Sequence, residues 1–142
     1  MGDEEKKSNL SKDEMKEVHE YYKHYRGAAI ALSATVIAIS GSLIYWLTGN
    51  FILKNFNDLS KCENLLVGVQ LLMFGISITF AVFVQYYHFK GYFHFARIYF
   101  NQSTSEDSNK NFNCMDHATD YGVLALLIGL IFTAIFYICK YL

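Results

Sequence analysis

The chain has 142 residues, of which 53% are hydrophobic and 17% aromatic, and it contains no proline. Its 12 basic and 13 acidic side chains nearly cancel. A neutral chain lacks the broad basic surface that proteins use to neutralise phosphates, which argues against binding to nucleic acid. The apolar residues gather in three blocks separated by polar stretches, a distribution that indicates contact with lipid and not a soluble core.

The N-terminal region is polar and changes character at Ser11. Residues 1–10 are charged and without periodicity, so we expect a mobile segment. Ser11 and Glu14 then form a capping box, in which each side chain satisfies a free backbone amide of a new helix. The following apolar positions share one helical face, and they are Met15, Val18, Tyr22 and Tyr25. We therefore predict an amphipathic helix that leads into the first membrane span, within a single membrane domain of residues 11–142.

The first span is predicted at residues 27–48, which carry no charge and extend about 33 Å as a helix. The segment before it is too long and too acidic for the start of a signal peptide. Small residues recur on the span in steps of three and four, a pattern that lets another helix approach closely. These residues are Gly27, Ala31, Ala34, Ala38 and Gly41.

The second span, at about residues 64–87, carries polar residues at helical spacing. Its polar face is formed by Gln70, Ser77, Ala81 and Gln85. Gly68 and Gly75 lie seven residues apart on the nearly opposite face. We expect both faces to pack against helices, and the polar face is alternatively the lining of a pore that other subunits complete.

The third span is predicted at residues 121–139, where Gly122 and Gly129 lie on one small face. Residues 101–120 before it have the composition of a flexible linker, so we expect a polar cytoplasmic loop there. The predicted fold class is all-α. It is an integral membrane bundle of three transmembrane helices, the first extended by an N-terminal cytoplasmic amphipathic helix.

The orientation in the membrane follows from the distribution of lysine and arginine. Nine of these residues lie in the N-terminal segment and the loop after the second span, and three lie on the opposite side. The positive-inside rule therefore places the N-terminus and the second loop in the cytoplasm, and the C-terminus on the other side.

Three histidines, His24, His88 and His117, are predicted at a similar cytoplasmic depth, one on each helix. Imidazoles so placed are candidates for pH sensing or for binding a transition metal or haem. No histidine pair at positions i and i+4 and no His-Glu motif fixes a site, so we favour a role as interfacial anchors and predict no cofactor.

The cysteines show no metal-ligand spacing. Cys62 and Cys139 are both predicted near the outer face, where a disulfide between them would join the second and third spans. Cys114 is predicted on the cytoplasmic side. The pair is therefore a candidate disulfide, and unpaired thiols are the alternative.

Catalysis finds no support in the sequence. No aspartate or glutamate lies inside a predicted span, and no nucleophile elbow or glycine-rich phosphate loop occurs, so we predict that the protein is not an enzyme. The favoured function is that of an accessory or structural subunit of a membrane complex, with the lipid bilayer and partner subunits or further copies of itself as its contacts. The alternatives are a homo-oligomeric pore, holin-like or membrane-disrupting effector, and a membrane immunity or regulatory protein.

Overall fold

The computed structural model describes residues 12–52, 59–98 and 105–141, and these residues contain no strand. Three long helices make up the fold, and they are α1 (Lys12–Leu47), α2 (Lys61–Ile98) and α3 (Ser105–Tyr141). A π-helical segment, η1 (Thr48–Ile52), continues α1. Each long helix is long and apolar enough to cross a membrane. The prediction of an all-α, multi-pass membrane bundle is confirmed.

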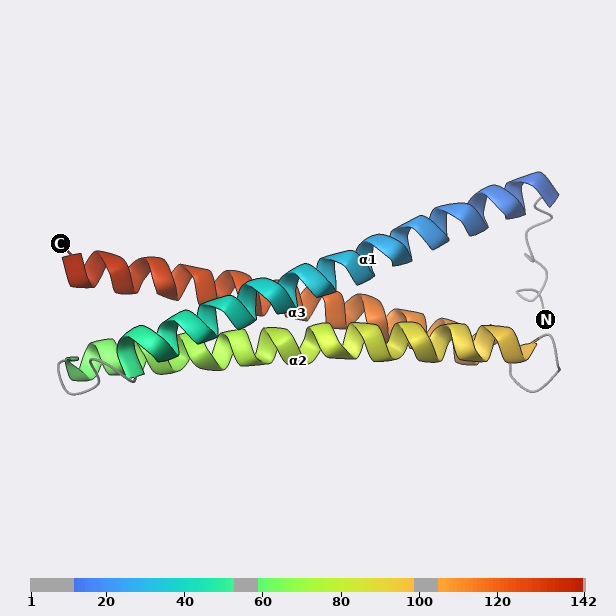
Figure 1. Cartoon of the computed structure of the whole chain (residues 1–142). Helices are drawn as coiled ribbons and strands as arrows, with labels where there is room; N and C mark the ends of the chain where they lie inside the picture. Colours follow the sequence, from blue (N-terminus) through green and yellow to red (C-terminus); the bar gives the residue numbers. More distant parts are fainter. Residues whose placement is uncertain (1–11, 53–58, 99–104, 142) are drawn as a thin grey trace, which may run out of the picture.

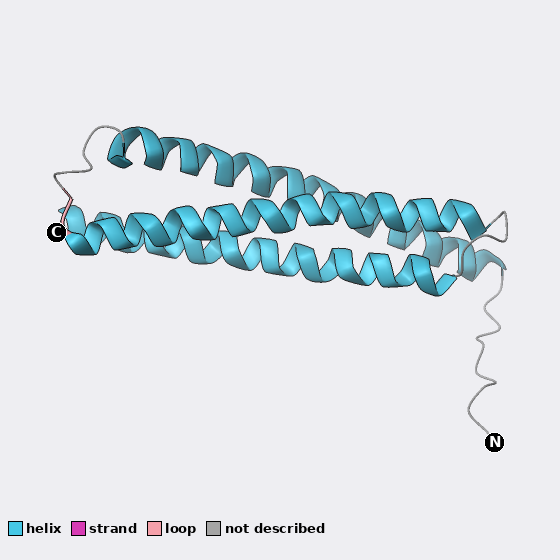
Figure 2. Ribbon diagram, turned by 90° about the horizontal axis from the view of Figure 1, so that it is seen from below, coloured by secondary structure: helices cyan, strands magenta, loops and turns pink. Residues whose placement is uncertain are grey.

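The three helices form one elongated bundle (Figure 1 and Figure 2). α2 and α3 run antiparallel and share the most extensive contact, whereas α1 lies across them at an angle. α1 diverges from both partners toward its N-terminal end (Figure 1). The beginning of α1 and the C-terminal end of α3 lie at opposite ends of the bundle.

The helices are longer than a membrane requires. They contain 36, 38 and 37 residues. At a rise of 1.5 Å per residue each is roughly 55 Å long, about 25 Å more than the hydrocarbon core of a bilayer. The charged stretches 12–26, 90–98 and 105–120 all lie at the end of the bundle where α1 begins. The bundle therefore extends beyond its apolar part at that end.

The predicted loop at residues 101–120 is wrong for most of its length, because α3 already begins at Ser105. Asparagine and aspartate are poor helix formers, but burial of an apolar stripe overrides this weak preference. Phe112, Met115 and Ala118 are each at most 5% exposed and pack together. The Asn111 side-chain amide also donates to the Asp107 carbonyl one turn earlier, at 2.6 Å, so it does not break the helix.

α2 begins three residues before the predicted span because Ser60 and Glu63 form a capping box at its start. The Ser60 backbone amide donates to Glu63 Oε2 at 2.7 Å, and the Glu63 amide donates to Ser60 Oγ at 3.2 Å. These two bonds satisfy amides at the free helix terminus. The cap predicted at Ser11 lies outside the described residues.

Segment η1 closes the other end of the bundle. It places Phe51 in the core, 5% exposed, with its ring centroid 4.9 Å from that of Phe136. The Lys140 ammonium lies 4.7 Å from the Phe51 ring centroid, a distance at which a cation is attracted to the aromatic face. Segment η1 is thereby held against the end of α3.

Glycines without a side chain admit phenylalanine rings between α2 and α3. A Cβ atom added at Gly129 would lie 2.5 Å from the Phe74 ring, and one added at Gly91 would lie 2.6 Å from the Phe112 ring. Phe74 is fully buried and Phe112 is 5% exposed, so both rings are held between the helices. Gly129 and Gly91 therefore fix how closely the two helices approach.

We predict that Gly129→Ala destabilises the bundle by about 1–3 kcal/mol, because the added methyl group overpacks the Phe74 ring. Gly75→Ala is the matched control, since a Cβ there meets no atom within 4 Å. Alanine also favours a helix over glycine, so this control should be neutral or stabilising by up to about 1 kcal/mol. Thermal unfolding in detergent measures both, and equal midpoints for the two variants would contradict the packing described.

Candidate functional site

The polar face of α2 points into the bundle and contacts both other helices. At its centre is Ser77, which is fully buried. Its hydroxyl donates to the Gly122 carbonyl of α3 at 2.8 Å. The Ser40 hydroxyl of α1 donates to Ser77 Oγ at 3.4 Å, a long and hence weak hydrogen bond. All three helices therefore meet through polar atoms at Ser77.

The contact at Ser77 depends on the missing side chain of Gly122. A Cβ atom added at Gly122 would lie 3.3 Å from Phe80 Cβ and 3.6 Å from the Ser77 carbonyl oxygen. The Ala81 backbone nitrogen would also lie 3.7 Å from that Cβ atom, so the α2 backbone runs directly past Gly122. This close approach brings the Gly122 carbonyl within reach of the short serine side chain.

Two turns toward the start of α2, Gln70 is fully buried and contacts α3. Its Nε2 atom donates to the Phe132 carbonyl at 3.4 Å. The Thr133 hydroxyl lies 3.2 Å from Gln70 Oε1 and 2.9 Å from the Gly129 carbonyl of its own helix. Because a hydroxyl carries one hydrogen, it serves one of these acceptors at a time.

Toward the other end of the same face, Gln85 contacts α1. Its Nε2 atom donates to Ser33 Oγ at 2.7 Å, and the Ser33 hydroxyl donates in turn to the Ile30 carbonyl at 2.8 Å. Ser33 is 3% exposed, whereas Gln85 is exposed. Gln85 thus ties α1 to α2 from the edge of the bundle.

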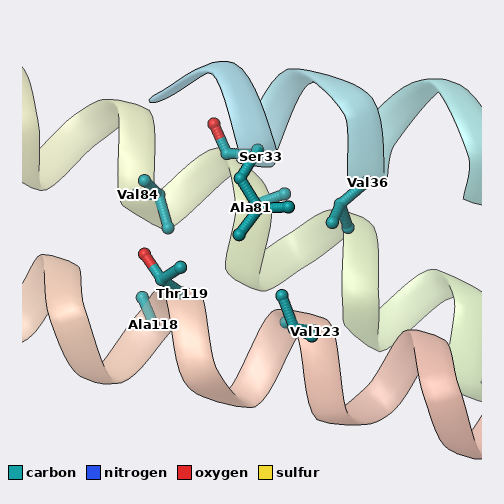
Figure 3. A pocket seen from close by; sticks show the side chains of 9 residues that line it. Ser33, Val36, Ala81, Val84, Ala118, Thr119 and Val123 are labelled. Atoms are coloured by element: carbon teal, nitrogen blue, oxygen red, sulfur yellow. The ribbon is translucent and has the colours of Figure 1, made fainter. Parts of the chain in front are cut away.

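Ala81 lies between Ser77 and Gln85 and is 2% exposed. It borders a small cavity of about 10 Å³ where the three helices face one another (Figure 3). Ser33 and Thr119 bring hydroxyl groups to its lining, beside Val36 and Val84. A cavity of this size holds about one water molecule, and it is too small for a substrate.

The small-residue faces point outward. A Cβ atom added at Gly68, Gly75 or Gly41 would meet no atom within 4 Å. Gly68, Ala34 and Ala38 are exposed, while Gly75 and Gly41 are partly buried. These residues therefore do not mediate close packing within the chain, and their faces are open along α1 and α2.

The three histidines do not form a metal site. Among the side chains that the structure describes, no group of three histidine, cysteine or acidic residues is placed to hold a metal ion. His24 and His117 are exposed, and His88 is partly buried with its ring centroid 4.8 Å from that of Tyr92. The structure therefore does not bring this trio together as a metal site, and haem binding and pH sensing stay hypotheses.

The disulfide hypothesis is also not realised. Cys62, Cys114 and Cys139 are all free thiols, and Cys62 and Cys139 are exposed. α2 and α3 are joined instead by the polar contacts at Ser77 and Gln70.

The α1 partners of the polar face were missed in the sequence. Ser33 and Ser40 lie seven residues apart with Val36 between them, and all three are at most 3% exposed. This spacing matches that of Gln70 and Ser77 on α2, and it is the sequence signal that could have identified the inward face of α1.

No known protein family, curated protein or solved structure matches this chain.

We predict that Ser77→Ala lowers the free energy of unfolding by about 0.6–1.7 kcal/mol, the range for hydrogen bonds between membrane helices. Ser42→Ala is the matched control, because the exposed Ser42 hydroxyl donates only to Ala38 of its own helix. Unfolding in mixed micelles measures both changes. If the two variants were equally stable, the contact at Ser77 would contribute nothing to the association of the helices.

Proposed function

We propose that this protein acts as an accessory or structural subunit of a membrane complex, and that it binds its partner through the outward small-residue face of α1. The face is defined by Gly27, Ala31, Ala34, Ala38 and Gly41. All of these except Gly41 are exposed, and Gly41 is partly buried. The observation that carries the proposal is that this face stays exposed although the three helices of the chain pack against one another.

Physical reasoning supports this use of the face. Lipid tails are as apolar as leucine, so membrane helices associate through close van der Waals packing, which small residues permit. On α1, the open spaces at Gly27 and Gly41 allow a neighbouring backbone to approach. The residues that hold α1 within the chain, Ser33, Val36 and Ser40, occupy a different face.

The homo-oligomeric pore receives less support. Its lining would need Gln70 and Ser77 to face water between subunits, but both side chains are fully buried and bonded within the chain. Turning this face outward would break the contacts that hold α2 to α3. Gln85 is the exposed member of the face, and its amide donates to Ser33.

The proposal is tested by photocrosslinking in native membranes. A benzophenone amino acid at position 34 should crosslink a membrane protein of a mass other than 16.3 kDa, because the partner helix lies against this face. The same probe at position 134 is the control, since Ala134 is also exposed but lies on α3. Crosslinks at both positions alike, or at neither, would contradict a partner site on α1.

The proposed orientation places the beginning of α1 in the cytoplasm, in accord with the excess of lysine and arginine at that end. We predict that green fluorescent protein fused before Met1 fluoresces, because it stays in the cytoplasm. The same protein fused after Leu142 should stay dark, because it is exported to the other side of the membrane. Fluorescence measured per molecule of fusion protein shows on which side of the membrane each terminus lies. Equal fluorescence from both fusions would require the termini to lie on one side.

A further inference from the structure

A polar recess of about 440 Å³ lies between α1 and α3 at the end of the bundle where α1 begins. Six side chains line it, and they are Tyr25, Arg26, Asn109, Phe112, Asn113 and Asp116. Arg26 is the last charged residue before the uncharged stretch of α1. The recess therefore lies at the level where the apolar part of the bundle ends, which is the depth of phospholipid headgroups.

The divergence of α1 gives this recess its shape. α1 separates from α2 and α3 in the direction of its N-terminal end (Figure 1). Phe112 forms the floor, because its ring is 5% exposed and lies against Gly91 of α2. The recess is thus a built feature of three helices, with one wall from α1 and the other from α3.

One wall of the recess is cationic. The Arg26 guanidinium carbon lies 3.4 Å from the centroid of the Phe112 ring, so the cation rests on the aromatic face. A guanidinium presents five N–H donors in one plane, and this planar fork matches the oxygens of a phosphate group. The contact with Phe112 restrains the position of the guanidinium group at the recess.

The opposite wall is anionic. Asp116 is partly buried and lines the recess. A carboxylate accepts hydrogen bonds from a ligand's N–H groups more strongly than a neutral acceptor does, so a ligand that brings an ammonium group is favoured there. Asn109 and Asn113 lie on the same helical face as Asp116 and add neutral amide groups to the rim.

We propose that this recess binds a phosphoethanolamine group, supplied as the headgroup of a phospholipid, with its phosphate on Arg26 and its ammonium on Asp116. A choline headgroup has no N–H donor for the carboxylate. A glycerol headgroup has no cation, and Asp116 repels its phosphate. The charge pair therefore selects ethanolamine lipid over both, whichever protein contacts the outer face of α1.

Native mass spectrometry of the delipidated full chain in detergent tests the selection. The chain is titrated separately with palmitoyl-oleoyl phosphatidylethanolamine, phosphatidylcholine and phosphatidylglycerol. We expect the first lipid to reach half-saturation at about one tenth of the concentration of the others, since a hydrogen bond to a charged group is worth about a factor of ten or more. Equal half-saturation for the three lipids overturns the proposal, and this comparison needs no variant.

Asp116→Asn should remove the preference for ethanolamine lipid, because it deletes the charge and keeps the side-chain volume. Asp120→Asn is the matched control, since Asp120 is exposed and lies one turn further along α3. It should retain the preference. An Asp116→Asn variant that folds, as judged by circular dichroism, and still prefers ethanolamine lipid contradicts the assignment of the ammonium to Asp116.

Competition with soluble glycerophosphoethanolamine separates the two sources of this group. If the ligand is a lipid, the soluble compound displaces it only at a concentration far above that of the lipid, because the acyl chains add to binding. Displacement at an equal concentration supports the phosphoethanolamine chemistry and assigns it to a soluble molecule. No displacement and no lipid preference together reject the site.

Discussion

The close approach of α2 and α3 at Ser77 and Gly122 is the constraint on which the rest of the fold depends. Gly122 has no side chain, so the α2 backbone passes directly beside it, and the Ser77 hydroxyl donates across the gap to its carbonyl at 2.8 Å. Gln70 extends this seam in one direction and the Gly91–Phe112 contact extends it in the other. α1 contacts this pair through Ser40 and Ser33, and it diverges from the pair toward its N-terminal end.

This constraint also determines which surfaces remain for other molecules. The polar side chains of α2 are turned inward, where they join helices that lipid alone would not drive together. The small side chains of α1 are turned outward, where they leave room for a partner helix. The third feature is the recess beside Arg26 and Asp116, which exists because α1 is held near its middle and C-terminal part more closely than at its beginning. The proposed partner site and the proposed lipid site thus use different residues of α1.

The number and type of helices were predictable from the sequence, because runs of more than 18 apolar residues have few alternatives to a membrane helix. The inward face of α1 was not predictable in the same way. Both the small face with Ala34 and Ala38 and the face with Ser33 and Ser40 repeat in steps of three or four, and in lipid neither is marked by hydrophobicity. The start of α3 was missed for a different reason, since burial of Phe112 and Met115 depends on tertiary contacts that override a composition typical of loops.

We propose that this chain is a three-helix unit that associates through its outer surface. The most direct test is the mass and subunit composition of the particle extracted from native membranes in mild detergent. We expect a heteromeric complex in which α1 contacts a transmembrane helix of another protein. A closed ring made only of this chain, with α2 facing a central channel, would contradict it.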